Sequence, residues 1–263
     1  MVNIGKYNTL KVVKQVDFGL YLDGGEGVEI LLPTRYVPKE AQVGDEIEVF
    51  IYHDNEGRLI ATTAKPFAQV GEFQFMEVKQ VNKMGAFLDW GIMKDLLVPF
   101  KEQKMAMKAG KWYLVYVRLD HVTGRVMASA RIEKFLNNVP PSYKHGEEVE
   151  LMVADEMELG YKVIINNLHT GLVYYDETFQ RLEKGERMKG YIKEVRDDEK
   201  IDVSLMPLGY QKVEGIAGTI LTALKTQGGY IAVHDKSEPD VIYALFRCSK
   251  KAFKQAIGSL YKQ

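Results

Sequence analysis

Residue types that carry enzyme chemistry occur in this sequence without the spacing that such chemistry needs. There is no Gly-rich phosphate loop ending in Gly-Lys-Ser/Thr, no HExxH and no Ser or Cys nucleophile signature. The acidic run at residues 197–199 is typical of a hairpin turn rather than of a catalytic pair. Histidines are scattered without metal-ligand spacing, at His53, His121, His145, His169 and His234. We therefore expect a non-enzyme with no metal, no cofactor and no small-molecule substrate.

Aromatic rings near the amino end offer a different chemistry. Phe18 and Tyr21 flank Gly19, and a bend at this glycine would turn both rings outwards. Bases of a single-stranded nucleic acid stack on such rings while nearby cations follow the phosphates. We predict a stacking site at this pair, with packing of the rings against a loop or a neighbouring module as the alternative.

A threefold repeat indicates which elements position these residues. Each copy has a glycine that opens a short apolar stretch, a second apolar stretch, and a second glycine that opens a long alternating segment. The two glycines lie 25 residues apart in every copy, at Gly19 and Gly44, Gly85 and Gly110, and Gly160 and Gly185. This constant spacing predicts one fold repeated three times.

Alternation within each copy predicts half-buried strands. In the first copy Ile47, Val49 and Ile51 alternate with residues of the opposite face. Five short strands hide their edges only by closing into a barrel, and the leading glycines suit a bulge or a sharp bend at a barrel corner. The fold expected is mainly β, with three tandem five-stranded OB-fold barrels. The strands of the first copy are predicted near residues 7–16, 18–23, 28–32, 45–53 and 58–63.

This order of features resembles the RNA-binding OB domain of the ribosomal S-one type, closely in copy one, less in copy two and weakly in copy three. Over essentially its full length the chain resembles the bacterial conserved virulence factor B family, most specifically in GYKVIINNLHTGLVYYDETF (160–179) and SKKAFKQAIGSLYKQ (249–263). The resemblance implies three such modules and a winged-helix end. It also implies surface contacts at Asp54 and Arg58 and a histidine that is missing at Pro33 and Pro99.

The other two copies keep less of this pattern. Copy two has Met84 where the first aromatic residue stands in copy one, and copy three has Leu159 and Lys162 at the paired aromatic positions and Tyr174 at the histidine position. We expect the third site to be degenerate. The candidate RNA contacts of copy two are Phe87, Asp120, His121 and Arg125.

Charge is distributed unevenly around a net value of −1. It is −3 over residues 1–66, +4 over 67–134, −6 over 135–208 and +4 over 209–263. Phosphate contacts supply most non-specific affinity, so copy two and the carboxyl end are the better electrostatic candidates. A short helix over 100–109 would gather lysines on one basic face, with a solvated surface as the alternative. These lysines are Lys101, Lys104, Lys108 and Lys111.

After Pro207 the apolar period changes from two to about 3.6, which predicts helices. One stripe ends at Gly228 and Gly229, and a helix that starts at Ser249 has apolar residues through Tyr261. Three helices resemble a winged helix, whose third helix often enters a DNA groove, although the two wing strands are absent here. DNA docking, RNA backbone contact and protein contact all stay open. The candidate contacts are Lys250, Lys251 and Lys254.

Three aromatic residues, Phe50, Tyr116 and Tyr191, each follow the second glycine of a copy by six residues, on the predicted outward face. Base stacking and packing between adjacent modules are both open for them. The single cysteine, Cys248, excludes an internal disulfide, and no apolar run has the roughly 20 residues that cross a bilayer. A cytoplasmic protein without a membrane partner is expected.

We expect barrels at residues 1–66, 67–134 and 147–208, a semi-rigid proline-containing connector at 135–146, and a small α-helical winged-helix-like domain at 209–263. The family resemblance implies a bacterial post-transcriptional regulator that binds single-stranded RNA without catalysis. A DNA-binding or protein-scaffolding regulator that acts through the last domain is the alternative.

Overall fold

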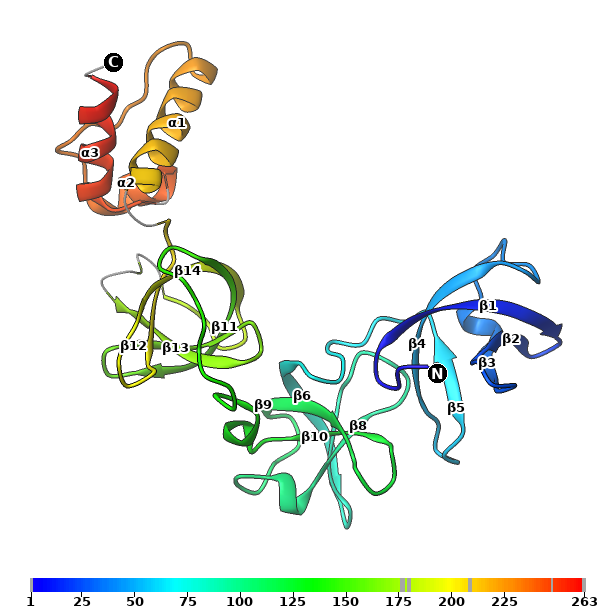
Figure 1. Cartoon of the computed structure of the whole chain (residues 1–263). Helices are drawn as coiled ribbons and strands as arrows, with labels where there is room; N and C mark the ends of the chain where they lie inside the picture. Colours follow the sequence, from blue (N-terminus) through cyan, green and yellow to red (C-terminus); the bar gives the residue numbers. More distant parts are fainter. Residues whose placement is uncertain (1, 176–177, 179–180, 208–209, 247, 262–263) are drawn as a thin grey trace. The chain divides into compact units, whose positions relative to one another are not determined.

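The computed structural model describes residues 2–175, 178, 181–207, 210–246 and 248–261. Within these residues, strands β1–β15 form three groups of five, and helices α1–α3 follow them (Figure 1). The three barrels and the helical end predicted from the sequence are confirmed. The predicted boundary between residues 208 and 209 lies outside the described residues. By its contacts the chain divides into two compact units, 1–135 and 136–263.

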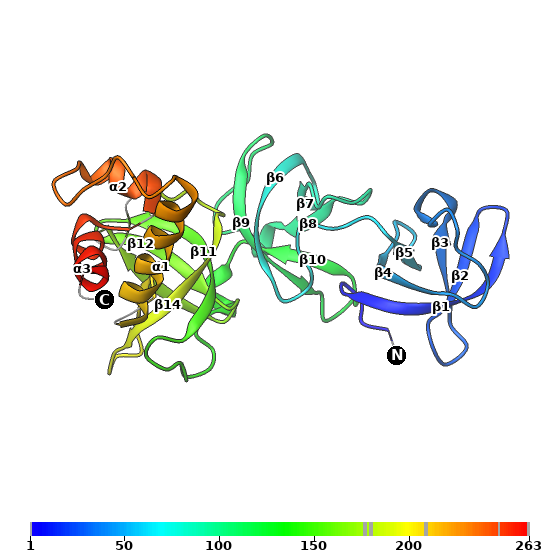
Figure 2. The ribbon, with the colours of Figure 1, turned by 90° about the horizontal axis from the view of Figure 1, so that it is seen from above.

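Barrel one shows how alternation becomes a closed sheet. Its strands run in the order β1-β2-β3-β5-β4, and β4 pairs back onto β1 (Figure 2). Leu20, Leu22 and Leu32 point inwards and are almost completely buried. The observed strands agree with the predicted ones to within one residue at each end. They are β1 (Tyr7–Val16), β2 (Gly19–Asp23), β3 (Glu29–Pro33), β4 (Glu46–His53) and β5 (Leu59–Thr62).

The other barrels repeat this plan. In barrel two the order is β10-β9-β6-β7-β8, and the end strands β8 and β10 lie against each other; barrel three closes in the same order as barrel one. The strands of barrel two are β6 (Phe73–Asn82), β7 (Gly85–Leu88), β8 (Leu96–Pro99), β9 (Trp112–Leu119) and β10 (Val126–Ser129). Those of barrel three are β11 (Glu148–Met157), β12 (Gly160–Ile165), β13 (His169–Tyr174), β14 (Arg187–Val195) and β15 (Ile201–Ser204).

The leading glycines mark a close approach between the second and third strands of each barrel. Their φ angles are +154° at Gly19, +147° at Gly85 and +157° at Gly160. A Cβ atom at these positions would lie 2.2, 2.2 and 2.1 Å from the carbonyl oxygen of the facing strand, so only glycine fits. The bulge itself lies in the long first strand, for example between Val12 and Lys14. It bends that strand so that it can pair on both sides.

Barrels one and two share a hydrophobic core. Phe50 and Tyr52 of β4 are buried against Trp90 of barrel two, with ring centroids 5.3 and 6.4 Å from the indole. The Trp90 Nε1–H donates to the carbonyl oxygen of Ala68 at 2.8 Å. For Phe50 the packing alternative is therefore confirmed. Tyr116 likewise stacks on Phe135 at 4.2 Å.

Tyr191, the third outward aromatic residue, makes a polar contact instead. Its hydroxyl donates to the Glu148 carboxylate at 3.2 Å, on the neighbouring strand β11.

The segment expected to be a connector is fastened to barrel three. The Asn137 N–H donates to the Leu168 carbonyl oxygen at 2.8 Å. His169 Nε2 donates to the Val139 carbonyl oxygen at 2.7 Å, and its Nδ1 lies 2.8 Å from the Tyr143 hydroxyl oxygen. Residues 137–143 thus run along the surface of the barrel that they precede.

The helical domain consists of α1 (Tyr210–Thr226), α2 (Pro239–Phe246) and α3 (Lys250–Leu260), with α1 and α3 side by side (Figures 1 and 2). Phe253 is completely buried in its core. The Ser249 hydroxyl caps α3 by accepting from the Ala252 N–H at 3.1 Å. The prediction that Tyr261 belongs to the apolar side is wrong, because this residue follows the end of α3, beyond the core, and is 92% exposed. In the described part of the chain no helix is long and apolar enough to cross a membrane.

Candidate nucleic-acid interface

Barrel one presents two aromatic rings on the surface where β2 begins. The Phe18 side chain is 57% exposed, and Tyr21 is half-buried beside it. Their ring centroids are 6.4 Å apart and the planes are nearly perpendicular. The Lys14 ammonium lies 5.6 Å from the centre of the Tyr21 ring, across the β1–β2 pair. An exposed ring, a second ring and a cation therefore share one surface, as base stacking and phosphate contact require.

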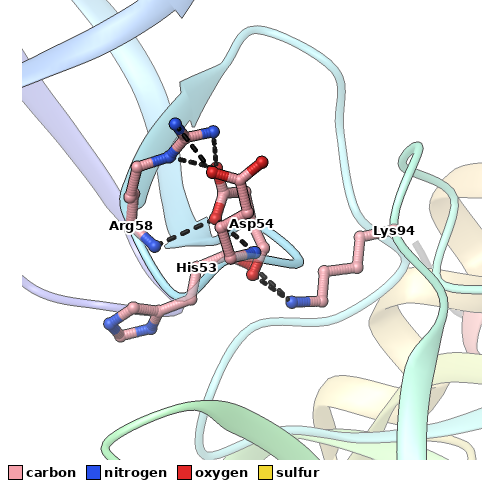
Figure 3. Close-up of polar contacts among 5 residues, drawn as sticks. His53, Asp54, Arg58 and Lys94 are labelled. Carbon is pink, nitrogen blue, oxygen red and sulfur yellow. Dashed lines mark hydrogen bonds and ion pairs between the residues drawn. The ribbon is translucent and has the colours of Figure 1, made fainter.

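The β4–β5 turn carries Arg58 and holds it in place (Figure 3). Asp54 Oδ1 accepts from the backbone N–H groups of Glu56 and Arg58, both at 2.9 Å. Its Oδ2 accepts from Arg58 Nε at 2.9 Å and Nη2 at 2.8 Å. Burial of Asp54 opposes the change, but these hydrogen bonds from Arg58 lower the pKa of the carboxyl group. Asp54 thus positions the turn, while the Arg58 side chain is 70% exposed.

The same turn docks on barrel two. Lys94 Nζ donates to the carbonyl oxygens of His53 and Asp54 at 2.6 and 2.9 Å (Figure 3). Burial, and then the positive charge of Arg125, lower the pKa of Lys94. A Cβ atom at Gly57 would lie 2.5 Å from Arg125 Nη2, so the Arg125 guanidinium lies on the turn of barrel one.

Arg125, one of the predicted contacts, has a neighbour that the sequence does not predict. The sequence assigns Arg125 to barrel two together with Asp120, by analogy with Asp54 and Arg58. In the structure the Asp120 carboxylate instead accepts from the Thr123 hydroxyl at 2.8 Å. Arg125 is exposed and adds a cation next to the Arg58 turn. The sequence analysis missed Lys94. Its partners are backbone oxygens of another barrel, and no side-chain pattern in the sequence indicates them.

On barrel two the predicted contacts Asp120, His121 and Arg125 lie on the β9–β10 turn, while Phe87 lies on β7. Phe87 is half-buried on β7, and His121 is exposed in the β9–β10 turn. The hydrogen bond from Thr123 lowers the pKa of Asp120, and the charge of Lys101 acts in the same direction. Lys101 therefore lies close enough to this turn for its charge to act on the Asp120 carboxylate.

The short helix that would gather the lysines over residues 100–109 does not form, and the four lysines lie on a solvated surface, which was the alternative. Only the 3₁₀ turn η2 (Phe100–Glu102) forms. The buried Gln103 side chain then holds the loop open, because its Nε2 donates to the Val98 oxygen at 3.0 Å and its Oε1 accepts from the Met107 N–H at 3.2 Å. Lys104 pairs with Glu133 at 2.6 Å, and Lys108 and Lys111 lie in the loop that follows. The lysines therefore form no single helical face.

Two separate segments of the chain match known protein families. Residues 4–64 match the model of the S1 domain, and residues 218–263 match that of the CvfB-like winged helix domain. Conserved virulence factor B of Staphylococcus aureus (strain USA300) is 27% identical over 269 residues, which cover 99% of this chain and 90% of that protein. The Bacillus subtilis (strain 168) protein YitL is 31% identical over 267 residues, 98% of this chain and 89% of that protein. The chain belongs to the conserved virulence factor B family.

This member of the conserved virulence factor B family therefore carries nucleic-acid-binding domains at both ends, and its partner is a nucleic acid. A crystal structure of a multidomain protein with nucleic acid binding domains from Streptococcus pneumoniae covers 98% of this chain and 93% of that one, with 24% sequence identity and a TM-score of 0.43.

Barrel three of this conserved virulence factor B chain has a polar surface in place of the stacking pair. Arg196 forms an ion pair with the buried Asp202 and donates to the Tyr174 hydroxyl. The Asp202 bond, then the Tyr174 bond, raises the pKa of Arg196. A cavity of about 480 Å³ lies beside Lys162 and this ion pair. Since the Arg196 side chain is 38% exposed, against 70% for Arg58, this surface offers less to a phosphate than barrel one does.

The three predicted lysine contacts of the helical domain differ from one another. Lys250 Nζ donates to the Lys236 carbonyl oxygen at 3.2 Å, so this ammonium already has a partner. Lys251 and Lys254 are exposed on the first half of α3. These two are therefore the side chains of the set that face water.

Proposed function

We propose that this chain is a non-catalytic RNA-binding protein of the bacterial cytoplasm, a post-transcriptional regulator that holds single-stranded RNA on barrels one and two. The observation that carries the proposal is the surface of barrel one, where Phe18 and Tyr21 lie with the Lys14 ammonium. Every base has a flat face, so such a surface takes up single strands with little regard to sequence.

Cations of barrels one and two support the proposed binding of single-stranded RNA. Asp54 holds Arg58 on the β4–β5 turn of the barrel that carries the two rings. Arg125 of barrel two reaches this turn at Gly57. A phosphate chain that leaves the rings of barrel one would meet cations of both barrels. Barrel two, with its net charge of +4 over residues 67–134, favours the continuation of a strand on its side.

Titration of a labelled oligouridine tests the proposal. The intact chain is expected to bind with micromolar or better affinity at about 50 mM salt, and binding should weaken steeply as salt rises. Phe18→Ala and Tyr21→Ala should each cost about 1–3 kcal/mol of binding free energy, since each removes a stacking face. Val43→Ala is the matched control, because Val43 is also 57% exposed on barrel one but lies outside the site. Absence of binding at this salt concentration would sink the proposal.

A second candidate is a DNA-binding regulator that acts through the helical domain. The observation that favours it is the exposure of Lys251 and Lys254 at the start of α3, where a recognition helix contacts DNA. Tighter binding of duplex DNA than of oligouridine, lost in the double variant Lys251→Ala and Lys254→Ala, would establish this function. An unchanged preference for single-stranded RNA in that variant would exclude it.

A further inference from the structure

In all three barrels, the residue before the leading glycine and the residue after the third strand are neighbours. The strand register pairs Gly19 with Pro33, Gly85 with Pro99, and Gly160 with Tyr174. The next residues outwards then face each other. In barrel one the Thr34 N–H donates to the Phe18 oxygen at 3.0 Å, and in barrel three the Tyr175 N–H donates to the Leu159 oxygen at 3.3 Å.

In barrel two these neighbours are Met84 and Phe100. Their side chains are 56% and 53% exposed. The position before the glycine, which carries Phe18 in barrel one, thus holds a flexible thioether in barrel two, while an aromatic ring stands on the adjacent strand end. Barrel one has Thr34 at that strand end. The exposed ring therefore belongs to the residue before the glycine in barrel one and to the residue after the third strand in barrel two.

In the turn that carries Phe100, a carboxylate is buried and the aromatic ring is exposed. In η2 the Glu102 carboxylate points inwards, is nearly buried and accepts from the Ser129 hydroxyl at 2.7 Å, while the Phe100 ring faces water. Arg118 Nη1 and Lys134 Nζ each lie 4.0 Å from this carboxylate, so polar partners account for the burial of Glu102. Exposure of the Phe100 ring costs free energy, and core packing does not explain it.

The equivalent ring of barrel three is used differently. The Tyr175 hydroxyl donates to the Met157 carbonyl oxygen at 2.8 Å, and its ring packs edge-on against Tyr161 at 5.4 Å. Within the described residues, Phe100 makes no such contact with another ring. Its face is available to a ligand, and Lys101 beside it acts electrostatically on Asp120 of the predicted site.

We propose that Phe100 is the base-stacking residue of barrel two, taking the place of the ring that Met84 does not supply. Together with Phe87 and Lys101 it gives barrel two a surface like that of Phe18, Tyr21 and Lys14 on barrel one. The ligand is one base of a single-stranded RNA, with the neighbouring phosphate near Lys101. This assignment rests on the proposed RNA binding and adds a residue that the repeat pattern does not mark.

Oligouridine affinity of three variants of the full chain separates stacking from apolar contact. Phe100→Leu keeps the apolar bulk but removes the flat face, and should weaken binding about 5- to 150-fold, as the loss of one base stack does. Phe100→Trp should bind at least as tightly as the unmodified chain. Met105→Ala, which changes a 66% exposed residue of the same barrel, should alter affinity less than twofold. A 5-iodouridine oligomer should photo-crosslink to Phe100.

The outcomes distinguish the two proposals. If the unmodified chain binds no oligouridine, the proposed function itself fails. If it binds and Phe18→Ala weakens binding, but Phe100→Leu leaves affinity unchanged and no crosslink forms at Phe100, only the assignment of Phe100 is overturned. Self-association that Phe100→Leu abolishes without any effect on RNA affinity would equally overturn it and would make the ring a protein contact.

Discussion

Arg58 faces water, yet Asp54 fixes its orientation by bonds to both the backbone and the guanidinium. The carboxylate form makes these bonds, and they hold the pKa of Asp54 below its ordinary 3.8 despite the opposing effect of burial. A lowered folded-state pKa means that the stabilisation is complete above the unfolded-state value and disappears as pH falls through the folded-state value.

Replacement of Asp54 tests this linkage. Asp54→Asn should lower the free energy of unfolding at neutral pH, and the gap to the unmodified chain should close as pH falls from about 5 to below 3.8. Urea unfolding at several pH values measures the gap. Glu40→Gln, which changes an exposed carboxylate of the same barrel, is the control and should show little effect at any pH. A gap that persists at low pH would show that the charge of Asp54 does not stabilise the turn.

Residue-level features that depend on one barrel could be predicted, whereas those that join two barrels could not. The exposed Phe18 follows from its position beside Gly19, where the chain bends. Arg125 was expected beside Asp120, because the repeat places them on one turn. Arg125 does lie on that turn, where its carbonyl oxygen accepts from the Asp120 N–H at 2.8 Å, but its guanidinium lies against Gly57 of another copy. No repeat alignment carries information on how copies dock.

Among the elements, the start of each second strand depends on the absence of a side chain. Gly19→Ala should lower the free energy of unfolding by about 2 kcal/mol or more, since its Cβ would lie 2.2 Å from the Leu32 carbonyl oxygen. Gly27→Ala, at φ +78° with no atom within 4 Å of its Cβ, isolates the backbone strain and should cost about 1 kcal/mol. Chemical unfolding of both variants measures these losses. If both variants lose the same free energy of unfolding, the close approach to the Leu32 carbonyl oxygen does not determine the cost at Gly19.

Secondary-structure elements were predicted correctly where a single hydrophobic periodicity defined them. Strands with strict alternation, such as β4, begin and end within one residue of the expected positions. The helix considered at 100–109, which lysine spacing alone suggested, does not form. Gln103 and Met107 are buried there, and the side-chain bonds of Gln103 to the backbone replace helical hydrogen bonds.

At the scale of the whole molecule, barrels one and two are one stability unit. Trp90→Ala removes a ring that is 1% exposed and that Phe50 and Tyr52 contact, and should cost about 3–5 kcal/mol. Hydrogen exchange should then rise in β4 of barrel one as well as in barrel two, while strands β11–β15 of barrel three keep their protection and serve as the internal control. Unchanged exchange in β4 would mean that the shared core does not couple the barrels.

The shared core also limits how this protein can be divided or recombined. A fragment that ends at residue 66 would carry Phe50 and Tyr52 to the surface, because the wall that covers them, with Trp90 at its centre, belongs to the next repeat. Such a piece would be prone to aggregate when expressed alone. Replacing the amino-terminal repeat alone with that of a relative should therefore disturb the shared core. Substitutions at residues 50, 52 and 90 should occur together among relatives.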